Sequence, residues 1–536
     1  MGARVVIIGG GFAGAFTAKW LRRRAPRNTQ INLINADNYF VFQPLLPEVA
    51  SGTINAPDAV TPLRLLLDGV RVRMAQVVDV DFEGKSLTLL QGSKRRPQQL
   101  GWDHLVLAVG QRTMLHKFPG LAEHSLSMRD LSDAHELRNK IIRRLEHADI
   151  TQDVELKRRL LTFVVAGGGF SGVETIGELM EMVQRTLRFY PNIANSEIHP
   201  ILVQRGERIL PELPARLGIY AARALSKRGV EIRLNASIAS ATQSAVFLED
   251  GSRIDTTLLV TTVGNGPHAF TEGLGLELEG GKIPVDACLA VRGRECVWAL
   301  GDAALVPLIT GNEENGSYAP PTAQFAVAEA KCLAANIARA MAGDALKKFD
   351  FRPKGSMASI GNYRGVAELF GIRITGLPAW ILWRFLYIGM LPGFSTRLRV
   401  ALNWLFDYFL PRSIVQIANR ASSSTRYARY AAKDVVVGPG QIPAGFYTVV
   451  SGCLESRIPD PETGEETVRL LGPGDHWGER TISSGRLTRG TLTAKEDTRV
   501  LVTAAEDFRK LRDVFPAMDT YFSNMEEDIR PREGPR

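Results

Sequence analysis

Two glycine-rich segments with the same internal spacing constrain this chain more than any other feature. They read VVIIGGGFAGAF near the N-terminus and FVVAGGGFSGVE further along. Each follows a β-branched run typical of a buried strand and opens a stretch typical of a helix. Their G-x-G-x-x-G glycines are Gly9, Gly11, Gly14 and Gly167, Gly169, Gly172. Such glycines let backbone N–H groups and a helix N-terminus approach a pyrophosphate, so the sequence predicts an α/β fold with two Rossmann-like dinucleotide-binding domains.

Two phosphate loops imply two nucleotides. A flavin paired with a nicotinamide is the usual combination, because flavin accepts hydride and passes electrons on. We therefore expect FAD as the cofactor and NADH or NADPH as the substrate. The expected domains are a discontinuous FAD-binding domain (residues 1–115 and 266–345), a nested NAD(P)H-binding domain (116–265), a membrane-associating segment (346–420), a β-roll (430–520) and a disordered tail (521–536).

The charge of the chain indicates its partners. The 536 residues carry a formal net charge of +8, which favours anionic surfaces. The basic residues are scattered and no basic run is interleaved with aromatic residues, so we expect no nucleic acid and favour the inner membrane leaflet. The chain starts MGARVVIIGGG, which leaves no room for a leader before the first strand and predicts a cytoplasmic protein.

The cysteines predict neither a metal site nor a redox disulfide. Cys288, Cys296, Cys332 and Cys453 are widely spaced, with no C-x-x-C or C-x-x-x-x-C pair. A zinc site or a redox-active disulfide would need such a pair. We interpret the four as small buried apolar residues.

The residues at the ends of the strands that follow the two glycine segments bear on nucleotide choice. An acid usually binds the ribose there; this chain has Asn35 in the first case, with Asp37 two residues on, and Gln204 in the second. Arg205 follows Gln204, and a neutral amide beside arginine removes repulsion of a 2′-phosphate and adds a cation. The sequence predicts that NADPH is accepted. The alternative is that the arginines there are only solvated surface charges.

Residues 374–412 raise the question of a membrane. Their apolar stretch covers about thirteen residues from Ala379 to Leu391, and a spanning helix needs about twenty. Leu398, Leu402, Leu405 and Phe409 then recur at helical spacing, with Trp380, Trp383, Trp404, Tyr408, Arg397, Arg399 and Arg412 around them. Apolar, aromatic and basic residues in this pattern favour an amphipathic helix that lies in the headgroup region. A core helix or a dimer interface is the alternative, and a homodimer stays open.

Several ordered motifs carry a family resemblance. YFVFQPLLPEVASG (39–52), HLVLAVGQRT (104–113), FPGLAEHSLSMRDLSDAHELRNKI (118–141), GGGFSGVETIGELMEM (167–182), KIPVDACLAV (282–291), WALGDAA (298–304) and PPTAQFAVAEA (320–330) resemble the type II NADH:quinone oxidoreductases, over roughly residues 4–415. The resemblance implies a peripheral, non-proton-pumping flavoprotein that passes hydride from NAD(P)H to FAD and electrons to a membrane quinone. It would act on the cytoplasmic face of the cell membrane.

The resemblance also implies roles for individual residues. Gly110, Gly301 and Asp302 are expected at the flavin, where Asp302 accepts from the ribityl chain. Glu174 is expected to relay protons to the quinone, although a first-turn acid stabilised by the helix dipole is the alternative. Gln324 begins the A-Q-x-x-x-Q pattern of the quinone site. Position 328, where the family has the second glutamine, is Ala328, which puts the acceptor in doubt.

The C-terminal part resembles a cyclic-nucleotide-binding β-roll over about residues 434–516. Gly478 and Glu479 match the family's ribose-binding pair. The phosphate-binding arginine is displaced, because Thr488 holds its expected position and Arg489 follows one residue late. The roll therefore either binds a cyclic nucleotide or is a degenerate docking or autoinhibitory domain.

Three other functions fit parts of the sequence. A sulfide:quinone oxidoreductase would need a cysteine pair near the flavin, and Cys332 stands alone. A ferredoxin- or rubredoxin-type reductase would lack the 374–412 segment. A flavin-based redox sensor, reporting to the β-roll without useful turnover, is the alternative from a different class.

Overall fold

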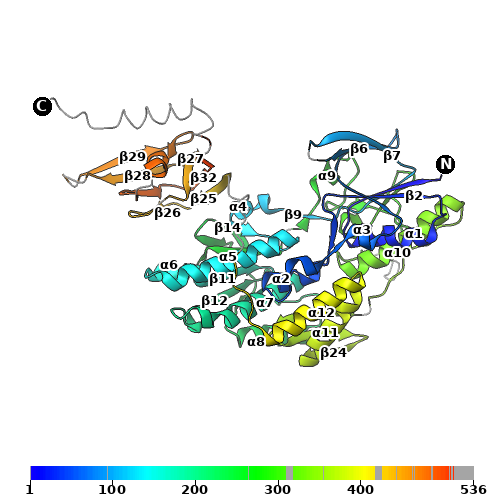
Figure 1. The fold of residues 1–536 in the computed structure, drawn as a ribbon, viewed down its shortest axis with the longest axis horizontal. Helices are drawn as coiled ribbons and strands as arrows, with labels where there is room; N and C mark the ends of the chain where they lie inside the picture. Colours follow the sequence, from blue (N-terminus) through cyan, green and yellow to red (C-terminus); the bar gives the residue numbers. More distant parts are fainter. Residues whose placement is uncertain are drawn as a thin grey trace.

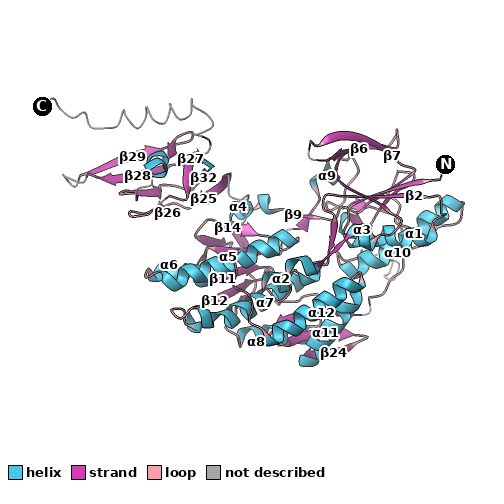
Figure 2. Ribbon diagram, viewed as in Figure 1, coloured by secondary structure: helices cyan, strands magenta, loops and turns pink. Residues whose placement is uncertain are grey.

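The computed structural model describes residues 2–511 apart from residues 93, 264, 309–317, 354, 417–424, 442, 461–462, 464, 485–486, 506 and 509–510. The expected tail at 521–536 lies outside the described residues. Figures 1 and 2 show two α/β units with a pair of helices along one side and a separate C-terminal β-unit.

The first unit is built on a seven-stranded sheet. In order its strands are β20 (Val297–Ala299), β8 (His104–Leu107), β1 (Arg4–Ile8), β2 (Gln30–Asn35), β5 (Arg71–Asp81), β6 (Ser86–Gln91) and β7 (Arg96–Gly101). The strands from β20 to β5 are parallel, and β6 and β7 add an antiparallel extension. The VVII run of β1 is fully buried, as expected for a central parallel strand. Helices α1 (Phe12–Arg24) and α10 (Ala323–Ala342) pack against each other beside it.

The second unit is built on a five-stranded parallel sheet. Its order is β10 (Ser125–Leu126), β17 (Leu258–Thr261), β11 (Thr162–Ala166), β12 (His199–Val203) and β13 (Glu231–Arg233). Helices α5 (Leu131–Ile150), α6 (Val154–Leu161), α7 (Phe170–Thr186) and α8 (Ala215–Ser226) belong to it, and the hairpin sheet of β14 (Ile238–Ala241), β15 (Ala245–Leu248) and β16 (Arg253–Asp255) precedes β17. The chain crosses between the two units at β9 (Arg112–Thr113) and β18 (Asn265–Gly266), which pair with each other.

A third layer follows α10. The antiparallel sheet of β22 (Gly355–Gly361), β23 (Arg364–Leu369) and β24 (Ile372–Gly376) packs on α7 and leads into α11 (Leu377–Met390) and α12 (Phe394–Phe409). Within the described part of the chain, no helix combines the length and apolar character needed to cross a bilayer. Both helices lie along one edge of the molecule in Figure 1.

The C-terminal unit is a β-roll of two four-stranded sheets. One contains β25 (Thr425–Tyr430), β32 (Thr498–Ala504), β27 (Gly445–Ser451) and β30 (His476–Trp477); the other contains β26 (Val435–Val437), β31 (Thr491–Ala494), β28 (Leu454–Pro459) and β29 (Glu466–Leu471). A separate apolar core lies between them. The mixed α/β fold with a C-terminal β-roll agrees with the expected fold class.

Candidate active site

The first glycine loop joins β1 to α1 and has open space at its tip. Gly9 has a φ of +107°, which favours glycine. A Cβ at Gly14 would lie 1.9 Å from the Gly9 carbonyl oxygen, whereas a Cβ at Gly11 would meet no atom within 4 Å. The backbone therefore needs glycine at two positions, and at Gly11 it leaves room beside the N-terminus of α1 for an anionic ligand.

The second glycine loop, between β11 and α7, repeats this geometry. Gly167 has a φ of +109°, and a Cβ at Gly172 would lie 1.7 Å from the Gly167 carbonyl oxygen. A Cβ at Gly169 would meet only Glu212 Oε1, at 3.5 Å. The two predicted fingerprints thus form two equivalent cradles in two different sheets.

A side-chain amide from the neighbouring strand holds each loop. Asn35 Oδ1 accepts a hydrogen bond from the Gly10 N–H at 2.8 Å. Gln204 Oε1 accepts one from the Gly168 N–H at 2.8 Å. Sequence reasoning identified both amides but missed these contacts, because spacing alone does not show which group an amide faces. The ribose contact of Asn35 stays a prediction, and Arg205 beside Gln204 is exposed.

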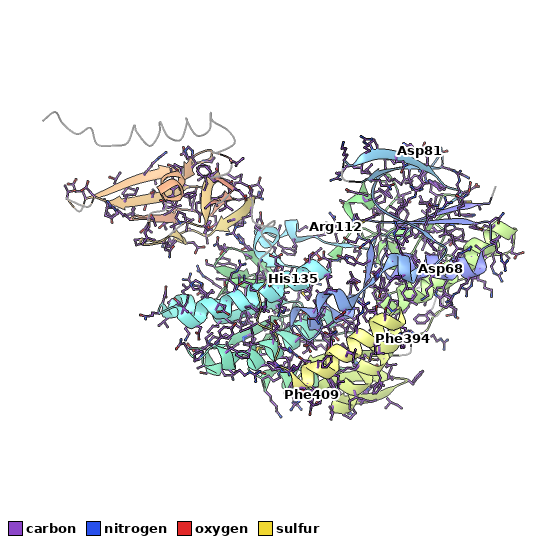
Figure 3. The ribbon with its side chains drawn as sticks, viewed as in Figure 1. Asp68, Asp81, Arg112, His135, Phe394 and Phe409 are labelled. Atoms are coloured by element: carbon purple, nitrogen blue, oxygen red, sulfur yellow. The ribbon has the colours of Figure 1, made fainter. Side chains whose placement is uncertain are left out.

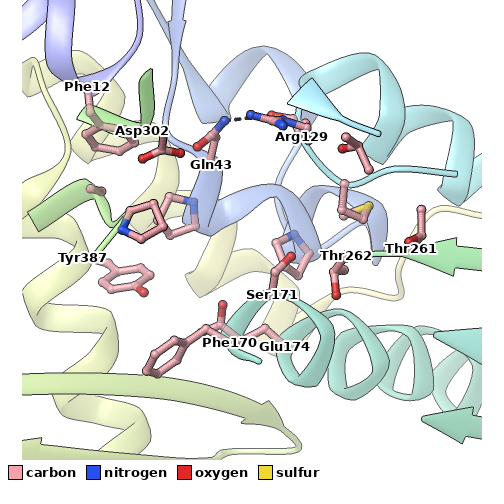
Figure 4. Close-up of a pocket in the computed structure, with 16 residues that line it drawn as sticks. Phe12, Gln43, Arg129, Phe170, Ser171, Glu174, Thr261, Thr262, Asp302 and Tyr387 are labelled. Carbon is pink, nitrogen blue, oxygen red and sulfur yellow. Dashed lines mark hydrogen bonds between the residues drawn. The ribbon is translucent and has the colours of Figure 1, made fainter. Parts of the chain in front are cut away.

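A cavity lies between the two loops (Figure 4). One part is lined by four of the predicted cofactor residues, namely Gly11, Gly110, Gly301 and Asp302. The adjoining part is lined by Glu174 and Ser171 of α7, by Tyr387 of α11 and by Thr261 and Thr262 at the end of β17. Both units and α11 therefore contribute to one site. Gln324 is half-buried and is not among the residues that line it.

A second buried acid supports the Gly-Asp turn. Gly301 has a φ of +67°, and its N–H donates to Glu329 Oε2 at 2.7 Å. Burial, together with the neighbouring Asp302, raises the pKa of Glu329 to about 7. Burial also raises the pKa of Asp302. Glu329, the residue next to Ala328, thus stabilises the turn by accepting the hydrogen bond from Gly301.

Glu174 is buried at the floor of the cavity. Its Oε1 accepts hydrogen bonds from the Ser359 N–H at 3.0 Å and from Trp383 Nε1 at 3.1 Å. Burial, together with the acids Glu48 and Glu178, raises the pKa of Glu174 to about 8. An acid with this pKa holds its proton at neutral pH, which suits a proton donor.

Glu48 of α2 (Leu46–Ala50) is a further buried acid that sequence reasoning missed. Its Oε2 accepts from Trp404 Nε1 at 2.8 Å, and its Oε1 lies 3.4 Å from Arg384 Nη2. Burial raises its pKa to about 7. Because Trp383 belongs to α11 and Trp404 to α12, one indole from each helix is anchored on a buried acid.

The outer surface of α11 and α12 is apolar. Phe385, Phe394, Leu398, Leu402, Leu405, Tyr408 and Phe409 are all at least 40% exposed, and Figure 3 labels Phe394 and Phe409. The expected helical face is therefore present. The sequence interpretation of Trp383 and Trp404 as surrounding interfacial aromatics is wrong, since both are buried against acids. Arg412 is buried too and pairs with Asp407 at 3.0 Å.

The β-roll residues that the sequence predicts to bind a cyclic nucleotide lie in different surroundings. Gly478 has a φ of +109°. It directly precedes α13 (Glu479–Ser484), and Glu479 is the first residue of that helix. Thr488 is buried, and its Oγ1 donates to the Gly490 carbonyl at 3.3 Å. Arg489 is exposed. Thr488 is thus buried and Arg489 faces solvent, and the part that either takes in cyclic-nucleotide binding stays a prediction.

The β-roll docks on the second unit through β25. The Arg429 N–H donates to Nε2 of His124 in α4 (Leu121–His124) at 2.7 Å, and Tyr430 Oη donates to Gln243 Oε1 at 2.7 Å. Arg499 Nη2 pairs with Glu123 Oε1 at 2.8 Å. Burial lowers the pKa of His124 to about 4, so its ring is neutral and accepts this bond.

The thiols take no part in the cavity. All four cysteines are free, and burial raises the pKa of Cys332 to about 11, which leaves that thiol protonated. Over the described ranges, no group of three or more His, Cys, Asp or Glu side chains is placed to hold a metal ion.

Three families match different parts of the chain. Residues 3–330 match the pyridine nucleotide-disulphide oxidoreductase family, residues 354–413 match the NDH2 C-terminal domain, and residues 427–514 match the cyclic nucleotide-binding domain. These matches confirm both resemblances inferred from the sequence.

Individual relatives agree with this division. The chain is 31% identical over 427 residues to the type II NADH:quinone oxidoreductase Ndh of Mycobacterium tuberculosis, covering 76% of this chain and 89% of the relative. It is 29% identical over 414 residues to the demethylphylloquinone reductase NdbB of Synechocystis, covering 75% and 95%. The solved structure of NDH2 from Plasmodium falciparum in complex with NADH aligns with a TM-score of 0.71 at 19% identity, covering 77% of this chain and all of that one.

Proposed function

The chain belongs to the type II NADH:quinone oxidoreductase family, and on that basis we propose that it oxidises NAD(P)H at a bound FAD and reduces a membrane quinone without pumping protons. One observation carries the proposal. Two adjoining pockets that share Arg129 and Asp302 in their lining connect the first glycine loop to Glu174 of α7, and a second, equivalent loop opens that same helix. Two nucleotides bound at these loops would meet inside the cavity.

FAD fits the first loop and its surroundings. A Cβ at Gly11 or at Gly110 would meet no protein atom within 4 Å, so both glycines face space for a ligand. The N-terminus of α1 would face the pyrophosphate, and Asp302 would accept from the ribityl hydroxyls. When bound, FAD supplies the hydride and electron chemistry. The protein positions the nicotinamide, keeps water out and holds a proton on Glu174.

NADPH is expected to be used because the second loop has no acid at the ribose position. Arg205 is exposed beside the neutral amide of Gln204, and a cation there would bind a 2′-phosphate. We expect Arg205→Met to raise the KM for NADPH about tenfold with little change in kcat, since one charged hydrogen bond contributes about 1.5–3 kcal/mol. NADH, which lacks that phosphate, is the internal control in the same steady-state assay. Equal changes for both nucleotides would contradict this assignment.

The quinone is expected to enter beside α11, with Tyr387 and Glu174 at the inner end of its route. Gln324 supplies the one remaining glutamine of the family pattern. Ala328 is half-buried where the second glutamine would stand, and neither Gln324 nor Ala328 lines the cavity, so a quinone beside Tyr387 and Glu174 would meet neither position of the family's glutamine pair. The choice of quinone is therefore expected to differ from relatives that carry both glutamines.

The face of α11 and α12 is proposed to bind the membrane surface. Phe394 is 81% exposed and Phe409 is 71% exposed, and burying each ring in lipid contributes about 1.5–3 kcal/mol. We expect Phe394→Glu with Phe409→Glu to lower binding to anionic liposomes more than tenfold in a flotation assay. Ile150→Glu, at a site that is 78% exposed on α5, is the matched control and should float like the parent. If the double variant also floats like the parent, a different surface of the protein binds the membrane.

We propose that the β-roll, which is docked on α4, regulates the turnover rate. Tyr430→Phe combined with Arg499→Ala removes two of its contacts with the second unit. We expect this variant to undock, seen as faster hydrogen exchange in α4, and to change kcat at least twofold. Cyclic AMP or cyclic GMP should change turnover in the same direction if the roll binds a cyclic nucleotide. Undocking that leaves kcat unchanged would reject regulation.

Steady-state turnover tests the proposed function as a whole. FAD-loaded protein should oxidise NADH or NADPH and reduce a short-chain quinone in a ratio of one to one over many cycles. Oxidation of nicotinamide with another acceptor but not with quinone would point to a different reductase. A single turnover without cycling would favour a redox sensor.

A further inference from the structure

Arg129 occupies a fixed position between the two units. It follows β10 and immediately precedes Asp130, the N-cap of α5. Its N–H donates to Asp133 Oδ2 at 3.0 Å, and its carbonyl accepts from Gln43 Nε2 at 3.2 Å. The backbone is therefore held from both sides, and the guanidinium projects from a rigid base.

The side chain of Arg129 points into the cavity. Figure 4 shows it beside Gln43, with Asp302 close by. Its Nη1 is enclosed and has no hydrogen-bond partner among the residues that the structure describes. A buried donor of a charged group is rarely left unpaired, because the cost is the full desolvation of that group. The orphaned Nη1 therefore indicates a ligand acceptor at this point.

The charge balance of the cavity indicates the kind of acceptor. Arg129 lines both parts of the cavity, and among the described residues that line them it is the sole cation, with Asp302 as the acid that both parts share. The part that contains Gly11 and Gly301 would receive the pyrophosphate of FAD, which brings two negative charges next to Asp302. The N-terminus of α1 offers only partial positive charge. A full counter-charge is needed there, and Arg129 is placed to supply it.

We propose that the guanidinium of Arg129 is the counter-ion of the FAD pyrophosphate. This inference rests on the proposed use of FAD. It adds a cofactor-binding residue that lies outside both glycine fingerprints and comes from the loop between β10 and α5 of the second unit. A guanidinium presents paired N–H donors that match phosphate oxygens, whereas a lysine offers only a point charge.

FAD affinity of the full-length apoprotein tests the proposal directly. The apoprotein is titrated with FAD by fluorescence quenching, for the parent, Arg129→Met and Arg129→Lys. We expect Arg129→Met to raise the Kd for FAD at least tenfold and Arg129→Lys to give a smaller increase. Arg96→Met, at an exposed arginine on β7, removes the same charge away from the cavity and should keep the parent Kd.

A second readout distinguishes the pyrophosphate from the flavin ring. ADP, which has the pyrophosphate without the ring, is measured as a competitor of FAD. We expect Arg129→Met to weaken ADP and FAD by the same factor. Loss of FAD affinity with unchanged ADP competition would overturn the proposal and place Arg129 at the ring. An unchanged FAD Kd in folded Arg129→Met would also overturn it; if that variant does not fold, an unchanged Kd in Arg129→Lys and in Arg129→Gln would do so. A parent apoprotein that takes up no FAD would instead refute the proposed function.

Discussion

Gly172→Ala is expected to leave FAD bound while strongly weakening its bleaching by NADH or NADPH, whereas Gly14→Ala is expected to lower the FAD content of the protein. The two substitutions are chemically identical and lie at equivalent places in the two loops. A Cβ would lie 1.7 Å from the carbonyl oxygen of Gly167 in one case and 1.9 Å from that of Gly9 in the other. The backbone of each loop would have to move, because the clashing atom is a carbonyl oxygen and no side-chain rotation can relieve the contact.

Both effects should be large and separable. Overpacking costs about 1–3 kcal/mol, so the affected nucleotide should bind roughly 5- to 150-fold more weakly. FAD content is measured from the flavin absorbance of purified protein, and nicotinamide bleaching is compared with chemical reduction by dithionite. Gly389→Ala is the matched control, because a Cβ at this glycine of α11 would meet no atom within 4 Å. Loss of FAD from Gly172→Ala with an intact Gly14→Ala would reverse the assignment of the two loops.

Glu174→Gln is expected to slow quinone reduction about a hundredfold while NAD(P)H still bleaches the flavin. Quinone reduction consumes protons, and a positioned general acid contributes about 10²–10⁴-fold. Glutamine keeps the hydrogen bonds from Ser359 and Trp383 at the carbonyl oxygen but has no acidic proton. The two half-reactions are followed separately by stopped-flow absorbance. Glu136→Gln, at an exposed acid on α5, is the control.

The pH dependence gives a second test of Glu174. With a pKa of about 8 the acid is protonated at pH 7, so quinone reduction should fall as the pH rises through about 8. Glu174→Gln should lack this step. Between pH 4.5, the ordinary value, and about 8, the folded protein holds a proton that the unfolded chain has lost. The free energy of unfolding due to Glu174 therefore falls with rising pH in that window, and Glu174→Gln should remove that dependence. An identical pH profile in both proteins would exclude Glu174 as the donor.

The features that the sequence predicts well are local. The two fingerprints depend on glycines within six residues, and their strand–loop–helix context follows from adjacent residues. The apolar face of α12 follows from helical spacing, so its exposed leucines and Phe409 were predictable.

The missed features all join distant parts of the chain. Trp404 reaches Glu48 across 356 positions, and Trp383 reaches Glu174 across 209. At the sequence level an indole beside arginines is typical of a membrane interface, and only the packing of α11 and α12 shows that these two indoles are buried. The residue periodicity of α11 and α12 does not indicate which buried acid each helix packs against, because Glu48 and Glu174 lie much earlier in the chain.

Arg129 shows the same limit within the site itself. In the sequence it is one arginine in SMRDLSDA, with no motif to mark it. Its significance appears only when the units come together and it is the one cation among the described residues that line the cavity. The loop contacts of Asn35 and Gln204 are similar, since residue type was predictable but the partner was not.

Anaerobic stopped-flow absorbance of the FAD-loaded protein tests the central claim most directly. The protein is first mixed with NADPH or NADH and then with a short-chain quinone, and flavin absorbance is followed through both steps. We predict fast bleaching by nicotinamide and fast recovery with quinone. Flavin that nicotinamide does not bleach, or bleached flavin that quinone does not reoxidise, would contradict the claim that this chain passes electrons from NAD(P)H to a quinone.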